Sequence, residues 1–273
     1  MKPASASPVF TTTDAAQDAA GPVVMTALHG LPEVAAGDDL VTLVCRAMAQ
    51  AGMAFQDGDV LVLAQKIVSK SEGRQLDLTA VIPSPRAETI AAQTHKDPRL
   101  VEAILSQSEA VLRAKPGVLV VSHRRGWVMA NAGIDQSNLP GAETDSVLLL
   151  PEDPDASARA LREGVRARTG VEVGVVIADS FGRAWRLGVV GVALGSAGFE
   201  ALEDWRGRLD RQDRPLAHTD IGRADEIAAA AGLLMGQAGE GRPVVLMRGL
   251  ALTPSDRGSA ADLIRPARVD MLR

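Results

Sequence analysis

VGVVIADSFGRAWR, residues 173–186, is the stretch that says most about the fold. It opens with a run rich in Val and Ile, which is typical of a strand in the core of a sheet. Asp179 closes this run, so we expect its carboxylate at the rigid end of a strand, facing a cleft. ANAGIDQSN, residues 130–138, places Asp135 after a second apolar run in the same way.

Two acidic strand ends of this kind can share a hard cation. Mg²⁺ and Mn²⁺ prefer oxygen ligands, and in phosphoryl-transfer sites they take one or two protein carboxylates together with water and phosphate oxygens. Asp135 and Asp179 are therefore candidate metal ligands. The residues alone favour an enzyme that uses a nucleotide.

The rest of the chain alternates between strand and helix patterns without a detectable repeat, which predicts a mixed α/β fold. Apolar runs predict strands at 22–28, 59–70, 173–178 and 243–249, and a hairpin formed by 118–123 and 126–132. Capping residues and apolar spacing predict helices at about 39–51, 84–95, 98–114, 154–168 and 223–235.

Composition excludes several classes of protein. The chain has 273 residues, 46% of them apolar, which is ample for a core. Its single cysteine, Cys45, lies in an apolar run and rules out an internal disulfide. The net charge of −5, with acids and bases interspersed, disfavours nucleic acid and anionic membranes as partners. Without a signal peptide or a membrane-spanning run, we expect a cytoplasmic protein.

Polarity along the chain also predicts its domain organisation. Residues 1–20 are rich in Ala, Ser, Thr and Pro and are predicted to be a flexible tail. Residues 21–250 are predicted to form the catalytic domain, followed by a C-terminal extension at 251–273. Familiar catalytic motifs are missing from all three parts. The sequence has no phosphate-binding loop, no dinucleotide fingerprint, no zinc spacing among its histidines and no nucleophile elbow.

The remaining candidate site residues are oxygen donors and cations at the ends of predicted strands and helices. Besides the two aspartates, Ser180 and Gln237 could join a metal shell, and Asn138 could bind a base or ribose. Lys66 and Lys70 follow a strand within reach of phosphates, with Glu72 placed to orient Lys70 by an ion pair. The structural alternatives are turn formation for the acids and a solvated edge for the lysines.

Two further features allow two readings each. Arg183 and Arg186 flank Trp185 and could bind phosphate or carboxylate, or could belong to an interface patch. The glycines between residues 188 and 198 could admit a ligand close to the backbone, or could let elements pack tightly.

Seven segments, in order, resemble the coenzyme F420-0:gamma-glutamyl ligase family. They are LPEVAAGDDL, QKIVSKSEGR, DPRLVEAIL, ANAGIDQSN, DSFGRAWRLGVVGVALGSAGF, TDIGRADEIAAAAGLLMGQAGEG and PVVLMRG, within roughly residues 25–250. The resemblance implies an unusual α/β fold with mixed sheets and flanking helices, in an interlocked homodimer. It also implies an enzyme that uses GTP, with two Mg²⁺ or Mn²⁺ ions and a monovalent cation such as K⁺, to join L-glutamate to a deazaflavin precursor.

The resemblance assigns roles by position. Asp135 and Asp179 match metal ligands, and Ser180 and Gln237 match ligands of a second ion. The positions that match GTP contacts are Leu31, Pro32, Glu33, Val34, Gln65, Lys66, Lys70, Asn138, Met235, Gly236, Gln237, Ala238, Gly239, Glu240, Gly241 and Arg242. GTP rather than ATP is implied by the resemblance alone.

The chemistry expected of such an enzyme assigns the catalytic residues. The γ-phosphoryl group passes to the acceptor carboxylate, and the glutamate amine attacks the resulting acyl phosphate. In this scheme Asp135, Asp179 and Lys70 act on the nucleotide, while Arg183 and Arg186 hold an acidic substrate. Two alternatives stay open: a non-catalytic nucleotide- or deazaflavin-binding module, and a structural dimer whose charged turns are helix caps.

Overall fold

A mixed sheet forms the centre of the computed structural model, which describes residues 21–137 and 145–270. Its strand order is β1-β12-β2-β8-β9-β13. β2 and β8 are parallel, and the other neighbours are antiparallel. The strands are β1 (Val24–Ala27), β2 (Val60–Ala64), β8 (Gly174–Arg183), β9 (Arg186–Phe199), β12 (Val244–Arg248) and β13 (Pro254–Ser255). The predicted mixed α/β fold is confirmed.

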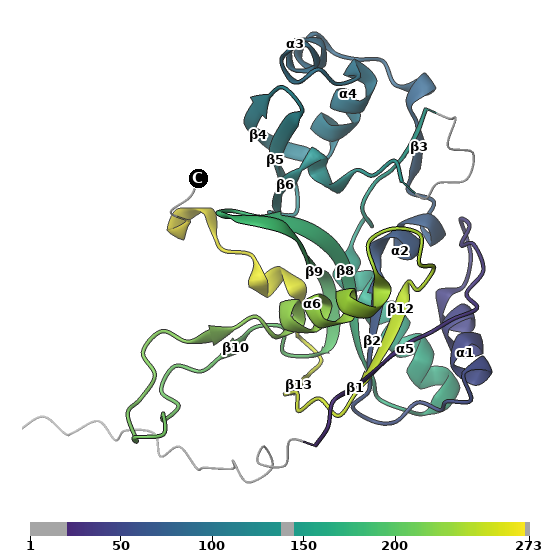
Figure 1. Cartoon of the computed structure of the whole chain (residues 1–273), viewed down its shortest axis with the longest axis vertical. Helices are drawn as coiled ribbons and strands as arrows, with labels where there is room; N and C mark the ends of the chain where they lie inside the picture. The colour runs from purple at the N-terminus through teal and green to yellow at the C-terminus, as the bar shows by residue number, and fades with distance from the viewer. Residues whose placement is uncertain (1–20, 138–144, 271–273) are drawn as a thin grey trace, which may run out of the picture.

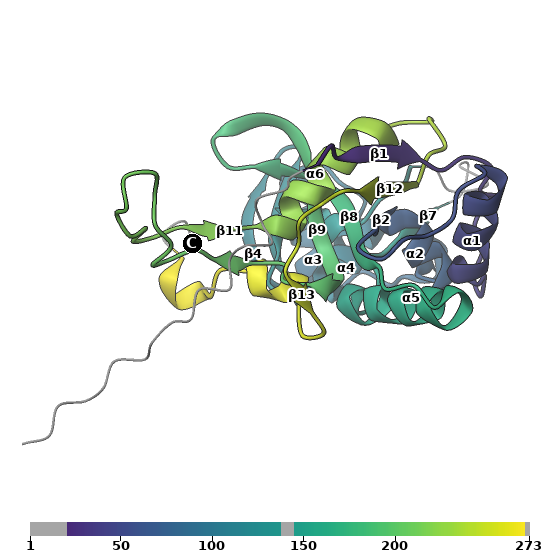
Figure 2. The same cartoon turned by 90° about the horizontal axis from the view of Figure 1, so that it is seen from below.

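Alternate residues of the central strands feed two apolar layers. Leu61, Leu63, Val175 and Ile177 pack with α1 (Leu40–Gln50) and α5 (Pro154–Thr169) on one face. The intervening residues of β2 and β8 pack with α6 (Arg223–Met235) on the other face. Figures 1 and 2 show α5 and α6 on opposite sides of the sheet. This period of two is what a sheet covered on both faces requires.

Two glycines of β9 allow the helices to approach. A Cβ on Gly191 would lie 2.3 Å from the Ala228 carbonyl oxygen of α6, and one on Gly195 would lie 2.3 Å from the Pro154 carbonyl oxygen of α5. Side chains at these positions would therefore push the helices away. Tight packing thus accounts for part of the glycine-rich stretch.

A second lobe stands beside the sheet at the top of Figure 1, with its own apolar core. It contains α3 (Pro85–Thr94), α4 (Pro98–Ser106) and a sheet of β4 (Ser108–Lys115), β5 (Val118–His123) and β6 (Val128–Ala130). The strands β3 (Gln75–Asp77) and β7 (Ser146–Leu148) pair with each other, and Leu76 and Val147 pack in the same apolar core.

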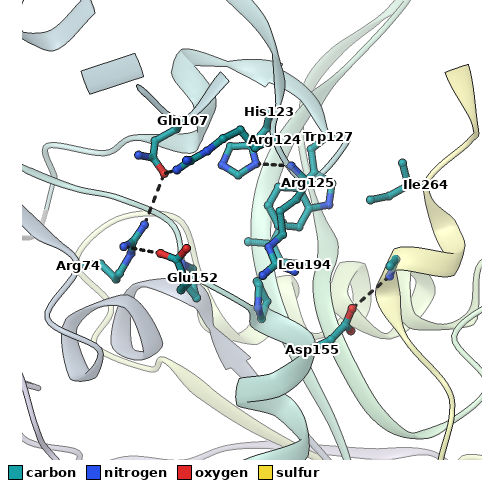
Figure 3. A pocket seen from close by; sticks show the side chains of 13 residues that line it. Arg74, Gln107, His123, Arg124, Arg125, Trp127, Glu152, Asp155, Leu194 and Ile264 are labelled. Atoms are coloured by element: carbon teal, nitrogen blue, oxygen red, sulfur yellow. Dashed lines mark hydrogen bonds and ion pairs between the residues drawn. The ribbon is translucent and has the colours of Figure 1, made fainter. Parts of the chain in front are cut away.

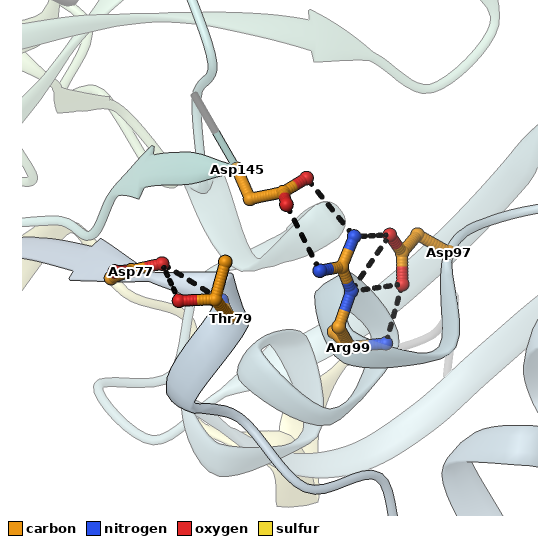
Figure 4. A network of polar contacts seen from close by, with 5 residues as sticks. All are labelled: Asp77, Thr79, Asp97, Arg99 and Asp145. Carbon is orange, nitrogen blue, oxygen red and sulfur yellow. Dashed lines mark hydrogen bonds and ion pairs between the residues drawn. The ribbon is translucent and has the colours of Figure 1, made fainter. Parts of the chain in front are cut away.

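Arg99 ties two segments of this lobe together (Figure 4). Its guanidinium group bonds to Asp97, which caps α4, and to Asp145, where the described chain resumes before β7. Bonding to Arg99 lowers the pKa of Asp97, although partial burial opposes the shift. The contact fixes the chain close to the start of β7.

Several predicted elements are confirmed: the hairpin β5–β6 and the helices α1, α3, α5 and α6. Either Asp38 or Asp39 was expected to cap α1, and the structure has Asp39 as the cap. Three boundaries are wrong. The strand predicted at 59–70 ends at Ala64, and residues Gln65–Ser71 form the helix α2. The helix predicted at 98–114 ends at Ser106, because residues 108–115 pair with β5 instead. The strand predicted at 173–178 continues to Arg183, because β9 supplies a long antiparallel partner.

Two hairpins extend from the sheet in Figure 2. One is the outer part of β8–β9, and the other carries β10 (Glu203–Asp204) and β11 (Asp220–Ile221).

Residues after 250 pack against the central sheet: β13 pairs with β9, and Leu252, Ala260 and Leu263 pack in the same apolar layer as α6. The predicted domain boundary at residue 250 stays a prediction. Within the described ranges, no helix has both the length and the apolar composition of a membrane span.

Candidate active site

A cavity of about 530 Å³ opens where β2 gives way to α2 and where α6 ends. Segments that lie far apart in the chain form its wall. The lining residues are 31–34, 64–67, Lys70, Asp135, Ser137, 178–180, Gly191, Ala228, Gly232, 235–239 and 241–243. The end of the parallel pair β2–β8 thus faces this cavity, as expected for a ligand site at the carboxyl ends of parallel strands.

The helix α2 presents two lysines to the cavity, one turn apart. Lys66 Nζ lies 2.6 Å from Asp135 Oδ2 and donates to Ser137 Oγ at 2.7 Å. Lys70 pairs with Glu33 of the facing loop. The predicted ion pair between Lys70 and Glu72 does not form, because Glu72 accepts from the Glu152 amide and the Ser157 hydroxyl instead.

Asp135 is held by the backbone on both sides. It forms an isolated antiparallel bridge with Leu148, and one carboxylate oxygen accepts from the Ser137 amide at 2.6 Å. Burial would raise the pKa of Asp135, but the bonds to Lys66 and Ser137 hold the pKa below its ordinary value. The carboxylate is therefore ionised at neutral pH.

Asp179 lies inside β8 rather than at its end, opposite Val192 of β9. Burial of the carboxyl raises its pKa to about 6, and the negative charge of Asp135 adds to the rise. The Ser180 amide and Lys66 oppose it only in part. Two carboxylates of this kind repel each other in a partly enclosed space, so a cation between them is favoured.

Ser180 and Gln237 meet on the α6 side of the cavity. The Ser180 hydroxyl donates to Gln237 Oε1 at 2.7 Å. Gln237 reaches this position because α6 ends at Met235 and Gly236 turns the chain with a φ of +77°. A hydroxyl and an amide oxygen therefore stand next to the Asp179 backbone.

Comparison with known proteins identifies the family. The family model described as F420-0:Gamma-glutamyl ligase matches residues 30–249. The chain belongs to this family. Proteins named coenzyme F420:L-glutamate ligase are similar over most of their length. The one from Methanothermobacter thermautotrophicus is 43% identical over 92% of this chain and 99% of its own. Those from Methanopyrus kandleri and Haloarcula marismortui are 46% and 44% identical, over 80% and 90% of this chain and 83% and 94% of their own.

Most positions that resemble the site of the F420-0:gamma-glutamyl ligase family come together in one cavity. Glu240 does not line it, but accepts from the Ala238 amide and so shapes the loop after α6. Asn138 lies outside the described residues. Arg183 and Arg186 face each other at the exposed end of the β8–β9 hairpin and do not line the cavity. Their predicted role in holding substrate stays a prediction.

The donor set fits a hard divalent ion. Among the described residues no group of three or more His, Cys, Asp or Glu side chains could hold a metal. The site offers two carboxylates, a hydroxyl and an amide oxygen. This small number of oxygen ligands suits Mg²⁺ or Mn²⁺, which would be bound mainly through phosphate and water. Arg242, which also lines the cavity, has a buried Nε without a hydrogen-bond partner in the described part of the chain. A phosphate oxygen is the kind of acceptor it lacks.

Sequence reasoning missed Ser137 as a site residue. Its amide and hydroxyl fix Asp135 and Lys66. The signal was the spacing Asp-x-Ser, which is typical of a turn in which the Asp side chain accepts from the second following amide. Ala228 and Gly232 of α6 were also missed as lining residues, whereas Gly191 belongs to the glycine-rich stretch that was expected either to admit a ligand or to allow tight packing.

Proposed function

We propose that this chain catalyses GTP-dependent addition of L-glutamate, through its amine, to the carboxylate of the deazaflavin precursor coenzyme F420-0. Membership of the F420-0:gamma-glutamyl ligase family and the names of its relatives support the reaction class. The single observation that carries the mechanism is the meeting of Asp135, Asp179 and Lys66 in one cavity. Repetition of the reaction would extend the product with further glutamates.

The reaction needs activation because a carboxylate does not condense with an amine in water. We propose that an oxygen of the acceptor carboxylate attacks the γ-phosphorus, so that GDP leaves and an acyl phosphate forms. The neutral amine of glutamate then attacks the acyl carbon, phosphate leaves with the C–O bond electrons, and the amine loses a proton. The sum is one amide, one GDP and one phosphate.

The residues of the cavity suit these steps. Lys66 and Lys70 approach phosphates from α2, and the loop after α6 contributes Arg242 to the wall. Asp135, Asp179, Ser180 and Gln237 would hold two divalent ions, and a monovalent ion such as K⁺ is proposed beside them. Bound there, these ions would neutralise the charge that shifts during phosphoryl transfer.

We also propose a homodimer. Trp185 and Leu187 at the end of the β8–β9 hairpin are 89% and 99% exposed. Exposed large apolar side chains on a projecting element are typical of a surface that another chain covers. Arg183 and Arg186 would then lie at the subunit interface, where they could reach an acidic substrate bound to the partner.

Mass spectrometry of the product tests the proposal. The protein is incubated with coenzyme F420-0, L-glutamate and Mn²⁺, with GTP or ATP in separate samples. The expected result is a mass increase of one or more glutamyl units with GTP, together with release of stoichiometric phosphate. Binding of GTP without any mass increase, under conditions where a family relative is active, would favour the non-catalytic alternative.

A further inference from the structure

A second cavity, of about 370 Å³, lies beside Arg74, just past the end of α2. The turn between β5 and β6, the segment before α5 and the C-terminal residues 261–264 enclose it (Figure 3). It shares no lining residue with the cavity described above. None of its lining residues is among those assigned above to the nucleotide, the metal ions or the acidic substrate.

Two guanidinium groups in this cavity converge on one neutral atom. Arg124 Nη2 lies 2.9 Å from Gln107 Oε1, and Arg74 Nη2 lies 3.5 Å from the same oxygen. Two positive charges this close repel each other, and an amide oxygen compensates them only weakly. An anion between them would satisfy both groups with charge-assisted bonds.

The acids around the cavity compensate this charge incompletely. Arg74 pairs with Glu152, whose side chain is 71% exposed, and Arg125 pairs with Asp153 at 3.2 Å. Asp155 points toward the C-terminal segment (Figure 3). Its carboxylate accepts from the Ser259 hydroxyl and the Ala260 amide of that segment, and from the Ser196 amide of β9. Arg124 has no carboxylate partner in the part of the chain that the structure describes.

The remaining wall is apolar and aromatic. Trp127 is 9% exposed, and its ring centroid lies 4.9 Å from that of His123. Burial, with the charges of Arg124, Arg125 and Arg74, lowers the pKa of His123 to about 4. The imidazole is therefore neutral at pH 7, and its Nδ1 accepts from the Arg125 amide. The positive potential of the cavity comes from the arginines.

We infer that this cavity is a second ligand site, which takes a small molecule bearing a phosphate or carboxylate group. The oxyanion lies between Arg124 and Arg74 in place of the Gln107 contact, and the rest of the molecule packs against Trp127. Guanidinium forks match both kinds of oxyanion, so the two sources are separated by experiment. This site is separate from the cavity that contains Asp135 and Asp179, hereafter the nucleotide cavity.

Fluorescence of Trp127 reports directly on this cavity. The chain has 3 tryptophans, so the variant W185F/W205F leaves Trp127 as its sole indole. The full chain is titrated with inorganic phosphate or with L-glutamate at constant ionic strength, with chloride as reference. The expected result is a saturable change with at least one of the two anions and none with chloride. Saturation by only one of them identifies the oxyanion class.

Matched variants locate the response. Arg124→Met, in the same background, should weaken binding about ten-fold or more, because a charge-assisted bond is lost. Arg113→Met, which removes an exposed charge on β4, should leave binding unchanged. Glu152→Gln should tighten binding, because it removes the competing carboxylate of Arg74. Lys66→Met, in the nucleotide cavity, should have no effect. Circular dichroism confirms that each variant folds.

The inference would be overturned by a response to chloride that equals the response to both anions, by no saturable response at all, or by a response that Arg124→Met leaves intact. A response abolished by Lys66→Met would move the binding to the first cavity and overturn it equally. None of these measurements uses ligase activity, so failure here is distinguishable from failure of the proposed reaction.

Discussion

Lys66 and Asp135 form an ion pair, with Nζ 2.6 Å from Oδ2, between the first turn of α2 and a bridge that leads out of the small lobe. The pair joins the central sheet region to the lobe at the wall of the cavity. Ser137 completes the contact, since its hydroxyl accepts from Lys66 while its amide donates to Asp135.

Replacement of Lys66 by Met should weaken nucleotide binding. The change removes a charge-assisted bond, which contributes about 1.5–3 kcal/mol, so Kd for GTP should rise on the order of ten- to a hundred-fold. Isothermal titration with GTP and Mg²⁺ measures this. Lys96→Met, which removes a charge outside the lining of both cavities, is the control. Equal affinities for the Lys66→Met and Lys96→Met variants would contradict the role of Lys66.

Asp179 should make the free energy of unfolding depend on pH, and a bound metal ion should reverse the direction of this dependence. Its pKa is raised to about 6 in the folded chain from 3.8, so the folded state holds the proton more tightly than the unfolded state. Without metal, stability should therefore fall as pH rises from about 4 to about 6. Mn²⁺, which binds the ionised form, should raise Tm more at about pH 7.5 than at about pH 5.

The variant Asp179→Asn separates these effects. It should lack the fall in stability over that pH range, and it should lose most of the rise in Tm with Mn²⁺. Product formation should fall by roughly a hundred-fold or more, because transition-state stabilisation is lost while the fold remains. Wild-type turnover in a variant that still binds Mn²⁺ would refute a catalytic role for the aspartate.

Gly191 should be intolerant of a side chain. Alanine there would place Cβ 2.3 Å from the Ala228 carbonyl, so α6 must shift, at a cost of about 1–3 kcal/mol. Gly182→Ala is the matched control on the paired strand, since no atom lies within 4 Å of its added Cβ. Urea unfolding compares the two. A Gly191→Ala variant as stable as Gly182→Ala would show that α6 does not pack as described.

The β8–β9 hairpin should carry the dimer contact. Leu187→Asp places a charge on a fully exposed apolar position, so it should not alter the monomer fold but should weaken association. Light scattering should give a dimer mass for the wild type and a smaller mass for the variant at micromolar concentration. Ile82→Asp, at another exposed apolar position, should stay dimeric. A monomeric wild type would remove the basis of the proposal.

Local signals were enough to predict where helices begin when a cap is followed by proline. Ser84-Pro85 and Asp153-Pro154 give α3 and α5 at nearly the expected boundaries. Residues 108–114 were predicted to continue a helix because Glu, Ala, Leu and Arg favour helix, but they form a strand because they pair with β5. Such long-range pairing leaves no trace in a short window of sequence.

The site shows the same division. Asp179 was expected at the end of a strand because the Val-rich run stops there. It lies within β8 instead, because pairing with β9 extends the strand, and the local sequence carries no signal of that pairing. Lys66 and Lys70 were expected after a strand and lie on a helix, because α2 begins without a capping side chain to mark it. Their approach to Asp135 depends on a fold that brings distant segments together.

The helix α2 spans only 7 residues, and the basic side chains at 66, 70 and 74 follow one another at intervals of four from its first turn to just past its end. Lys66 and Lys70 face the first cavity, and Arg74 faces the second. The turn at Glu72-Gly73, where Gly73 has a φ of +66°, separates Arg74 from the helix itself. The nine residues from Lys66 to Arg74 nevertheless contribute to the walls of both cavities, so a change in the path of this one segment would alter both.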